Sequence, residues 1–408
     1  MSNQPSRRQF LQTTAIGTAL GAASIASAQT IPGFDDHGPA ADTTKTWTPV
    51  SDRKVRVGIA GYGYCKFGAA FGLQDHPNVE LVGVTDLFAD RRAGLMRATR
   101  CERSYTSLEE MVKDDRIEAI FCATDAPSHA RHARLVLEHG KHVSSAVPAT
   151  FGSIEEGEQL LETVRRTELK YMMFETSCYR ADCCAMRALY RAGALGKVLY
   201  SEGEYNHYHA SKEPTPSYKG WRRGLPPLWY PTHSTAYLVG VTDESFTSVS
   251  CIATPGRLPY HQFEANPYGN SNALEVGLFE TSSGGTSRMM VAWNARPAPG
   301  IGTETGRVLG QFGSSQNGQY TGTWPKEKLP NLSQPLLPPG VPAGGHGGSH
   351  GRLGDEWISA ILQNRQPLVD IIAALNMTVP GIVAHQSAMK DGERLPIPQY
   401  RRSPRDSD

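Results

Sequence analysis

The sequence has no excess of charge of either sign, because 41 lysine and arginine residues stand against 40 aspartate and glutamate residues. Such a balance argues against a protein dedicated to nucleic acid or to anionic membrane surfaces. Its 7 cysteines form no Cys-x-x-Cys pair and no spacing typical of zinc ligands. We therefore expect no nucleic-acid partner, no metal and no disulfide framework. The length of 408 residues predicts about two domains.

A hydrophobic run of membrane-spanning length is also missing from the N-terminal region. The apolar stretch 15–26 is too short and too rich in small residues to cross a bilayer. It follows the twin-arginine pattern Ser-Arg-Arg-Gln-Phe-Leu at 6–11 and ends in the cleavage pattern Ala-Ser-Ala at 26–28. Residues 1–28 are therefore expected to be a twin-arginine signal peptide, a tethered helix being the alternative. The mature protein would then be periplasmic or otherwise exported, with 29–52 as a linker or arm.

A glycine-rich turn follows the first strongly apolar segment. Residues 55–60 have the pattern of a buried strand, which stops at Gly61-Tyr62-Gly63 and is followed by a helix-compatible segment, 64–73. A buried strand, a glycine turn and a helix N-terminus together hold the pyrophosphate of a dinucleotide. Gly61 would permit the tight turn and Gly63 the close approach of the phosphates, with Tyr64 at the start of the helix.

The third glycine of the G-x-G-x-x-G fingerprint is absent, because Lys66 occupies its position, and this predicts a looser approach of helix to strand. A second strand, 79–85, is followed directly by Asp86, 25 residues after Gly61. An acidic residue there accepts hydrogen bonds from both ribose hydroxyls and repels a 2′-phosphate. NAD is therefore the predicted cofactor, and an ordinary βαβ unit with a glycine turn is the alternative.

Two more continuous apolar segments, 117–124 and 141–148, continue the same βα pattern. With a helix over 154–166 and a strand over 170–174, they predict a doubly wound parallel sheet, a Rossmann domain covering 53–175. In such sheets ligands lie beyond the carboxyl ends of the strands. The residues expected to contact the nucleotide are Gly61, Gly63, Tyr64, Asp86, Thr124, Pro127, His129, Val147 and Pro148.

Residues 176–400 have a different pattern. Alternating segments (197–209, 246–253, 273–281, 286–293 and 307–312) predict a largely antiparallel sheet with one open face. Helices over 355–362 and 370–390 close this second, α+β domain, and 401–408 is expected to be a solvated tail. The chain is thus predicted to be an α/β protein with a Rossmann domain followed by a substrate domain.

Aromatic, basic and histidine side chains gather between two of these strands, in Trp221-Arg222-Arg223 and in Trp229-Tyr230-Pro-Thr-His233. Aromatic faces suit the C–H surfaces of sugars, and histidine exchanges protons near neutral pH. A histidine at the start of a helix is otherwise a capping or packing residue. The candidate substrate-binding residues are Trp221, Arg222, Tyr205, His207 and His350.

Together, the glycine turn, Asp86, Thr124-Asp-Ala-Pro-Ser-His129, Gly140-Lys-His-Val143 and Val147-Pro148 resemble the Gfo/Idh/MocA oxidoreductase family. The resemblance implies a nicotinamide cofactor and an open-faced sheet domain that binds sugars or related polyols. It also implies a histidine at the start of the helix where His233 stands. Many members have Glu-Lys-Pro where this chain has Ala-Val-Pro at 146–148. Val147 can neither transfer a proton nor orient a substrate as that lysine does.

Tyr230-Pro-Thr-His233 is most similar to the branch of NAD-dependent α-N-acetylgalactosaminidases, which has a functional tyrosine where Tyr179 stands. The run Gly344-Gly-His-Gly-Gly-Ser-His350 partly resembles the Gly-His-Gly-Gly-Met signature of that branch, whereas its acidic residue near Ala146 is missing. The resemblance therefore implies that His233, Tyr230 and Tyr179 carry the proton transfers.

An exported protein with a nicotinamide site must keep its cofactor and regenerate it in every catalytic cycle. We therefore expect an oxidoreductase of a sugar or sugar derivative with tightly bound, internally recycled NAD. One alternative is a glycosidase that transiently oxidises C3 and so acidifies the neighbouring C2–H for elimination. Another is a non-catalytic sugar-binding protein with a vestigial cofactor site. A homo-oligomer formed through the open sheet face is also expected.

Overall fold

The computed structural model describes residues 46–208, 214–262, 266–297 and 302–402. The expected signal peptide 1–28, most of the expected arm and most of the tail lie outside the described residues. Within the described ranges, every helix is too short or too polar to cross a lipid bilayer.

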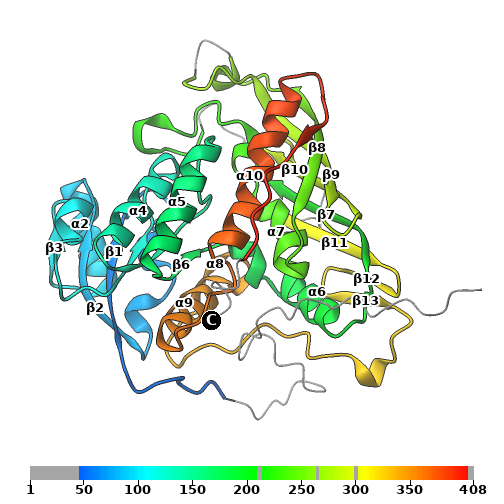
Figure 1. Cartoon of the computed structure of the whole chain (residues 1–408). Coiled ribbons are helices and arrows are strands. Elements are labelled where there is room, and N and C mark those ends of the chain that lie inside the picture. Colours follow the sequence, from blue (N-terminus) through cyan, green and yellow to red (C-terminus); the bar gives the residue numbers. More distant parts are fainter. Residues whose placement is uncertain (1–45, 209–213, 263–265, 298–301, 403–408) are drawn as a thin grey trace, which may run out of the picture. The chain divides into compact units, whose positions relative to one another are not determined.

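The first sheet has six parallel strands in the order β3-β2-β1-β4-β5-β6 (Figure 1). Its strands are β1 (Val55–Ala60), β2 (Val79–Thr85), β3 (Ser104–Tyr105), β4 (Ala119–Cys122), β5 (His142–Ser145) and β6 (Tyr171–Met173). The strand order reverses between β1 and β4, and ligands of doubly wound sheets bind at the carboxyl ends beside such a switch. The predicted parallel sheet is thus confirmed.

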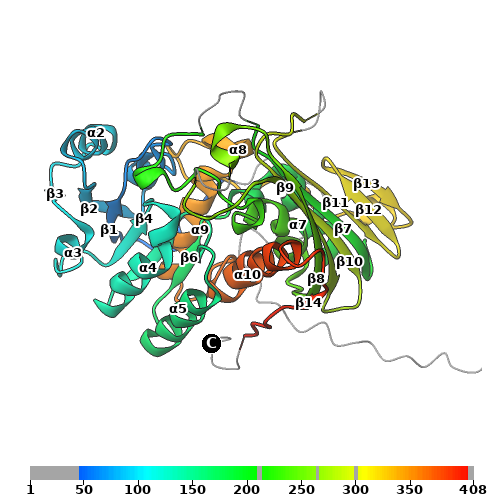
Figure 2. The ribbon, with the colours of Figure 1, turned by 90° about the horizontal axis from the view of Figure 1, so that it is seen from above.

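Helices cover both faces of this sheet (Figure 2). They are α2 (Ala89–Thr99), α3 (Leu108–Met111), α4 (His129–Glu138) and α5 (Ile154–Thr167). In α5 the Ser153 side chain accepts a hydrogen bond from the Glu156 N–H, and Glu155 and Glu156 lie in the first turn. A side-chain cap and early acidic residues both stabilise a helix start, which explains why this helix begins at Ile154.

The helix predicted over 64–73 is wrong. After β1 the chain makes two short 3₁₀ turns instead, η1 (Phe67–Ala69) and η2 (Leu73–Asp75). Each turn follows a residue in the left-handed region, Lys66 with φ 52° and Gly72 with φ 69°. Left-handed residues interrupt a right-handed helix, so two short 3₁₀ turns and no long helix follow the glycine turn.

The looser packing predicted from Lys66 is also wrong, because a later glycine supplies the close approach. A Cβ atom on Gly68 would overlap the carbonyl oxygen of Gly61 and lie 3.2 Å from the Ile59 side chain. The segment after the turn therefore packs directly on the end of β1. Gly68 performs the task of the third fingerprint glycine two positions after Lys66.

The second sheet has eight strands in the order β13-β12-β11-β7-β10-β9-β8-β14. They are β7 (Val198–Asn206), β8 (Phe246–Pro255), β9 (Asn272–Thr281), β10 (Thr286–Ala292), β11 (Glu304–Gly310), β12 (Gly313–Gln316), β13 (Gln319–Gly322) and β14 (Leu395–Pro396). Among the described strands of this second sheet, only the pairing of β7 with β10 is parallel. The predicted, largely antiparallel sheet is confirmed.

In the described part of the chain, helices lie on one face of the second sheet (Figures 1 and 2). The helices of this domain are α6 (Ala181–Arg191), α7 (Thr232–Thr242), α8 (Gly345–Gly348), α9 (His350–Leu362) and α10 (Ile371–Ala388). Every residue of α7 is buried. Two sheet glycines make room for it, because a Cβ on Gly203 would overlap the Ser234 carbonyl and one on Gly306 would overlap the Tyr237 ring.

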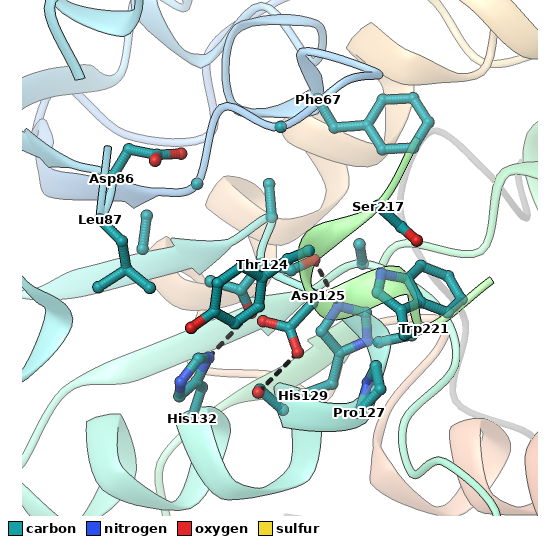
Figure 3. A pocket seen from close by; sticks show the side chains of 18 of the residues that line it. Phe67, Asp86, Leu87, Thr124, Asp125, Pro127, His129, His132, Ser217 and Trp221 are labelled. Carbon is teal, nitrogen blue, oxygen red and sulfur yellow. Dashed lines mark hydrogen bonds between the residues drawn. The ribbon is translucent and has the colours of Figure 1, made fainter. Parts of the chain in front are cut away.

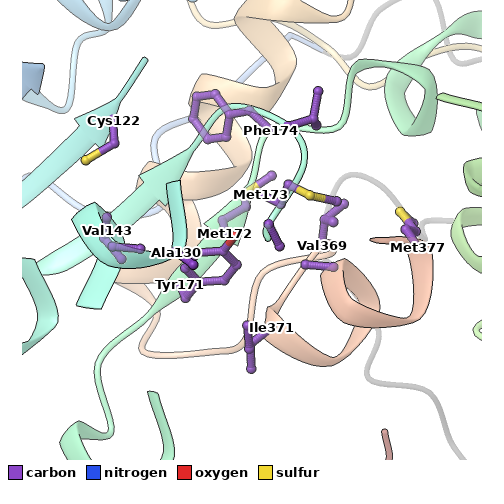
Figure 4. Packing of buried hydrophobic residues seen from close by; sticks show 14 of the residues in the cluster. Cys122, Ala130, Val143, Tyr171, Met172, Met173, Phe174, Val369, Ile371 and Met377 are labelled. Carbon is purple, nitrogen blue, oxygen red and sulfur yellow. The ribbon is translucent and has the colours of Figure 1, made fainter. Parts of the chain in front are cut away.

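One hydrophobic core joins the two sheets where β6 meets the start of α10 (Figure 4). Tyr171 and Met173 of β6 are fully buried or nearly so, and Val369 and Ile371 cover them from the second domain. The Met173 N–H also donates to the Val369 carbonyl oxygen at 3.0 Å. The carboxyl end of β6 is thereby held close to the helices that carry the second-domain site residues.

Candidate functional site

A cavity of about 430 Å³ lies at the carboxyl ends of the first-sheet strands (Figure 3). This volume is within the range of pockets that bind small molecules and cofactors. Eight of the predicted cofactor-binding residues line it: Gly61, Gly63, Tyr64, Asp86, Thr124, Pro127, His129 and Val147. Pro148 does not line the cavity, and its carbonyl oxygen instead bonds the His129 ring.

The glycine turn has room for a phosphate. Gly61 has a φ of 103°, and a Cβ there would lie 2.7 Å from the Ala123 carbonyl carbon, so only glycine fits. An added Cβ on Gly63 would meet no atom within 4 Å. The backbone at Gly63 therefore borders open cavity space, which an anionic diphosphate can enter.

Asp86 is buried at the end of β2, with both carboxylate oxygens held by backbone. The Tyr62 N–H donates to Oδ2 at 2.7 Å and the Phe88 N–H donates to Oδ1 at 2.9 Å. These bonds orient the carboxylate beside the glycine turn, where an acidic group bonds the adenosine ribose of a dinucleotide. The residues present at the turn and at β2 thus fit NAD.

His129 ties two loops of the pocket together. Its Nδ1 lies 2.8 Å from the Pro148 carbonyl oxygen and its Nε2 3.2 Å from that of Thr124. Burial lowers the pKa of His129, and the backbone carbonyls of Pro148 and Thr124 oppose this shift. The Thr124 hydroxyl also bonds the His132 Nδ1 at 2.9 Å. These contacts hold the loop after β4 against the loop after β5.

The second domain supplies the opposite wall through Trp221, Arg222 and Tyr230. The Arg222 guanidinium lies 4.2 Å from the centre of the Trp221 ring and 5.9 Å from that of Tyr230. Burial raises the pKa of Tyr230 to about 12, although Arg222 opposes the shift. The Tyr230 hydroxyl therefore stays protonated near neutral pH and can donate a hydrogen bond to a substrate oxygen.

His233 lies behind Tyr230 at the start of α7, with ring centres 5.7 Å apart. Its Nδ1–H donates to the fully buried Glu175 carboxylate at 2.8 Å. Burial lowers the pKa of His233, but the carboxylates of Glu175 and Glu304 outweigh it and raise the pKa above its ordinary value. For Glu175, burial raises the pKa, but His233, the Thr232 hydroxyl and the Ser177 N–H lower it by more, so its pKa lies below the ordinary value. Since Nδ1 is engaged, Nε2 is the nitrogen left for proton exchange.

Tyr205 and His207 lie in the same aromatic cluster as His233, and none of these three side chains lines the cavity, which Tyr230 of the cluster does. The Tyr205 ring centre is 4.5 Å from that of His233 and 5.5 Å from that of His207. Tyr179 is placed elsewhere. Its fully buried side chain is in the electrostatic environment of Glu356 and Arg365 and does not line the cavity.

The sequence predicted His350 of the glycine-histidine run as a substrate-binding residue, but it is His346 of this run whose ring lies against His233. His346 stacks on His233 with ring centres 6.2 Å apart, and its Nδ1 lies 2.9 Å from the His350 Nε2. His350 packs on Phe71 at 4.4 Å, and burial lowers its pKa to about 4. In the described ranges no three His, Cys, Asp or Glu side chains are arranged to hold a metal ion.

Residues 55–175 match the model of the Gfo/Idh/MocA oxidoreductase family with an NAD-binding Rossmann fold. The matched residues are those of the first domain. Glycosyl hydrolase family 109 protein 1 of Bacteroides fragilis is 32% identical over 214 residues, which are 49% of this chain and 46% of that protein. An alpha-N-acetylgalactosaminidase of Bacteroides fragilis is 29% identical over 164 residues, 38% of each chain. The matched region spans less than half the length of these curated relatives.

Solved structures extend the likeness of fold to the second domain. Levoglucosan dehydrogenase in complex with NADH and levoglucosan has a TM-score of 0.69 at 16% identity, covering 85% of this chain and 100% of that one. Apo scyllo-inositol dehydrogenase from Lactobacillus casei has a TM-score of 0.66 at 16% identity, covering 85% and 99%. At such identities the likeness shows the two-domain fold alone.

Two buried carboxylates of the site were not predicted from the sequence. Glu175 lies two residues after the sixth parallel strand, and Asp86 directly follows the second, so the strand-end rule that selected Asp86 could have selected Glu175 too. Glu304 begins β11 and accepts a hydrogen bond from the Ser177 hydroxyl at 2.8 Å, with the His346 Nε2 at 3.9 Å. No motif marks Glu304, because only the pairing of β11 with β7 brings it there.

Proposed function

We propose that the protein is an NAD-dependent oxidoreductase of a sugar or sugar derivative that keeps its cofactor through each cycle. The proposal rests on one cavity that has the glycine turn on one wall and Tyr230, Arg222 and Trp221 on the other. The hydrogen-bonded pair of His233 and Glu175 lies behind Tyr230. Aromatic rings and a guanidinium suit the C–H faces and oxygen atoms of a carbohydrate. The curated relatives named as glycosyl hydrolases, and the levoglucosan and inositol dehydrogenases of like fold, support a carbohydrate substrate.

Gly61, Gly63 and Asp86 would hold the dinucleotide, and the Asp86 carboxylate favours NAD over NADP by repelling a 2′-phosphate. When bound, NAD would supply the hydride acceptor for oxidation of one sugar, and a second carbonyl compound would take the hydride back. The side chains of this protein handle the protons. His233 Nε2 takes or gives the proton of the reacting hydroxyl, and Glu175 orients the imidazole and stabilises its charged form. Tyr230 donates a hydrogen bond to a substrate oxygen, and Val147 gives an apolar wall.

The expected export and the resident cofactor are tested together. The full chain is expressed in a bacterium with a twin-arginine pathway, and the periplasmic protein is gel-filtered, denatured and assayed for nucleotide. We expect periplasmic protein with a stoichiometric amount of NAD(H), and we expect lysine in place of Arg7 and Arg8 to retain it in the cytoplasm. Protein found only in the cytoplasm contradicts export. Exported protein free of nucleotide contradicts the resident cofactor and favours the non-catalytic alternative.

A glycosidase with transient oxidation is the second candidate. The names of the family 109 relatives and Val147 in the place of the family lysine favour it. Incubation with a glycoside deuterated at C2 separates the two. Cleavage accompanied by loss of deuterium to water indicates oxidation followed by elimination, because removal of the C2 proton is then part of the reaction. Accumulation of a keto-sugar without cleavage, when a second carbonyl compound is added as hydride acceptor, indicates the oxidoreductase.

A further inference from the structure

A segment of the second domain reaches across the cofactor cavity to the end of β2. Residues 216–219 line the same cavity as Leu87, Phe88 and Arg91, which follow Asp86. Figure 3 shows Asp86 and Leu87 on one side of the cavity and Ser217 on the other. The Tyr218 ring meets the Phe88 ring edge-on, with centres 6.0 Å apart and planes at 72°. The two domains therefore touch through a pair of aromatic rings beside the cavity.

Exposed apolar side chains gather around this cavity. Tyr64 is 65%, Leu87 61% and Phe88 42% exposed, and all three line it. Exposed apolar groups that converge on one pocket indicate a ligand surface that covers them. Adenine is the flat, aromatic part of a dinucleotide, and aromatic rings bind such groups by stacking and edge contacts. Asp86 marks this end as that of the adenosine ribose.

Two cationic side chains flank the ring pair. The Arg91 guanidinium lies 4.5 Å from the centre of the Phe88 ring, and the Lys219 ammonium lies 5.3 Å from that of Tyr218. Both residues line the cavity. Positive charge beside the rings complements the negative diphosphate that joins the two halves of the cofactor.

We propose that Phe88 and Tyr218 form an interdomain clamp over the adenosine half of NAD and thereby retain the cofactor. The clamp rests on the proposed function, for which it provides the means of retention. Phe88 belongs to the Rossmann domain and Tyr218 to the second domain, so release of NAD requires the 216–219 segment to separate from α2. The clamp thus controls how fast the cofactor leaves, independently of proton transfer at His233.

The test measures exchange of the bound cofactor in the protein as isolated. Each variant is mixed with excess radiolabelled NAD, and labelled protein is separated by gel filtration over time. We expect Tyr218→Ala and Phe88→Ala each to exchange about two- to tenfold faster, as removal of a single aromatic contact predicts. The double variant should exchange no faster than the faster single variant, because both changes open the same clamp.

Tyr218→Phe keeps the ring and should retain slow exchange, which separates loss of the clamp from a general defect. Tyr208→Ala is the matched control, since Tyr208 is 39% exposed in the same domain, contacts Arg296 and does not line the cavity. If Tyr218→Ala exchanges its bound NAD at the same rate as the wild type, the clamp proposal is wrong even though the protein holds NAD. If the wild type carries no nucleotide, the resident-cofactor function fails. The clamp is then judged by whether Tyr218→Ala releases added NAD faster than the wild type does.

Discussion

Replacing His233 by alanine is expected to lower kcat by about 10²–10⁴-fold while leaving NAD bound, the range typical of a lost general acid–base. His233 is buried at the start of α7, and its Nδ1 is fixed by Glu175 at 2.8 Å. It does not line the glycine turn that would hold the phosphates. Its removal therefore affects proton transfer and leaves the cofactor contacts of Gly61, Gly63 and Asp86 in place.

The measurement pairs steady-state kinetics with the nucleotide content of the denatured protein. The matched control is His385→Ala, because His385 also has its Nδ1 on a buried carboxylate, that of Glu275 at 2.6 Å, but its ring packs on Trp229, whereas that of His233 packs on Tyr230 of the cavity wall. We expect this control to lose stability and to keep kcat. Full turnover by His233→Ala would return His233 to a packing role.

The pH dependence of kcat provides a second readout of the same variant. The pKa of His233 is raised by the two carboxylates beyond the effect of burial, so its charged form persists above the ordinary histidine range. The stabilisation from the pair with Glu175 is fully present below the unfolded-state pKa of histidine and is lost as pH rises through the raised value. The limb of the kcat profile that belongs to this group is therefore expected above the ordinary range, and to be absent in His233→Ala.

Changing Gly203 to valine is expected to destabilise the protein by more than about 4 kcal/mol, as severe overlap in a packed interior does. A Cβ at this position would lie 2.6 Å from the carbonyl carbon of Ser234 and overlap its oxygen. Both partners are backbone, in the centre of β7 and the first turn of α7, so neither can rotate away. The helix that carries His233 would have to lift from the sheet.

Urea unfolding followed by circular dichroism measures this loss. Gly63→Ala is the control, compared with the wild type in nucleotide-free protein because Gly63 borders the cofactor cavity. An added Cβ there meets no atom within 4 Å, and we expect its stability to change by less than about 1 kcal/mol. Comparable stability of Gly203→Val and the wild type would mean that α7 does not rest directly on β7.

Much of the first domain can be predicted from short stretches of sequence. The apolar run 55–60, the turn at Gly61 and the acidic residue at the end of β2 are local signals, since each depends on neighbouring residues of one strand and one turn. The helix predicted over 64–73 failed for a local reason too. A lysine in the left-handed region carries almost no sequence signal, because non-glycine residues adopt that conformation rarely and in many contexts.

The second-domain site depended on contacts between distant segments. Tyr205 and His233 were predicted from their strand and helix positions, and the structure brings them together. Glu304 pairs across β11 and β7, and His346 reaches His233 through the glycine run before α9. Register and loop path determine such contacts, and neither is encoded within a single segment. Tyr179 is the opposite case. Its motif predicted a role in proton transfer, but its side chain is buried near Glu356 and Arg365 and does not line the cavity.

The sequence by itself determined the parallel Rossmann sheet, the glycine turn and the position of Asp86, because strand periodicity and turn chemistry are properties of consecutive residues. It also determined that aromatic, arginine and histidine side chains occur together in the second domain. Only the tertiary structure decided that Gly68 replaces the missing fingerprint glycine, that Glu175 and Glu304 raise the pKa of His233, and that Tyr218 meets Phe88 across the cavity. These are contacts between segments far apart in the chain, and their distances depend on how helices and sheets pack.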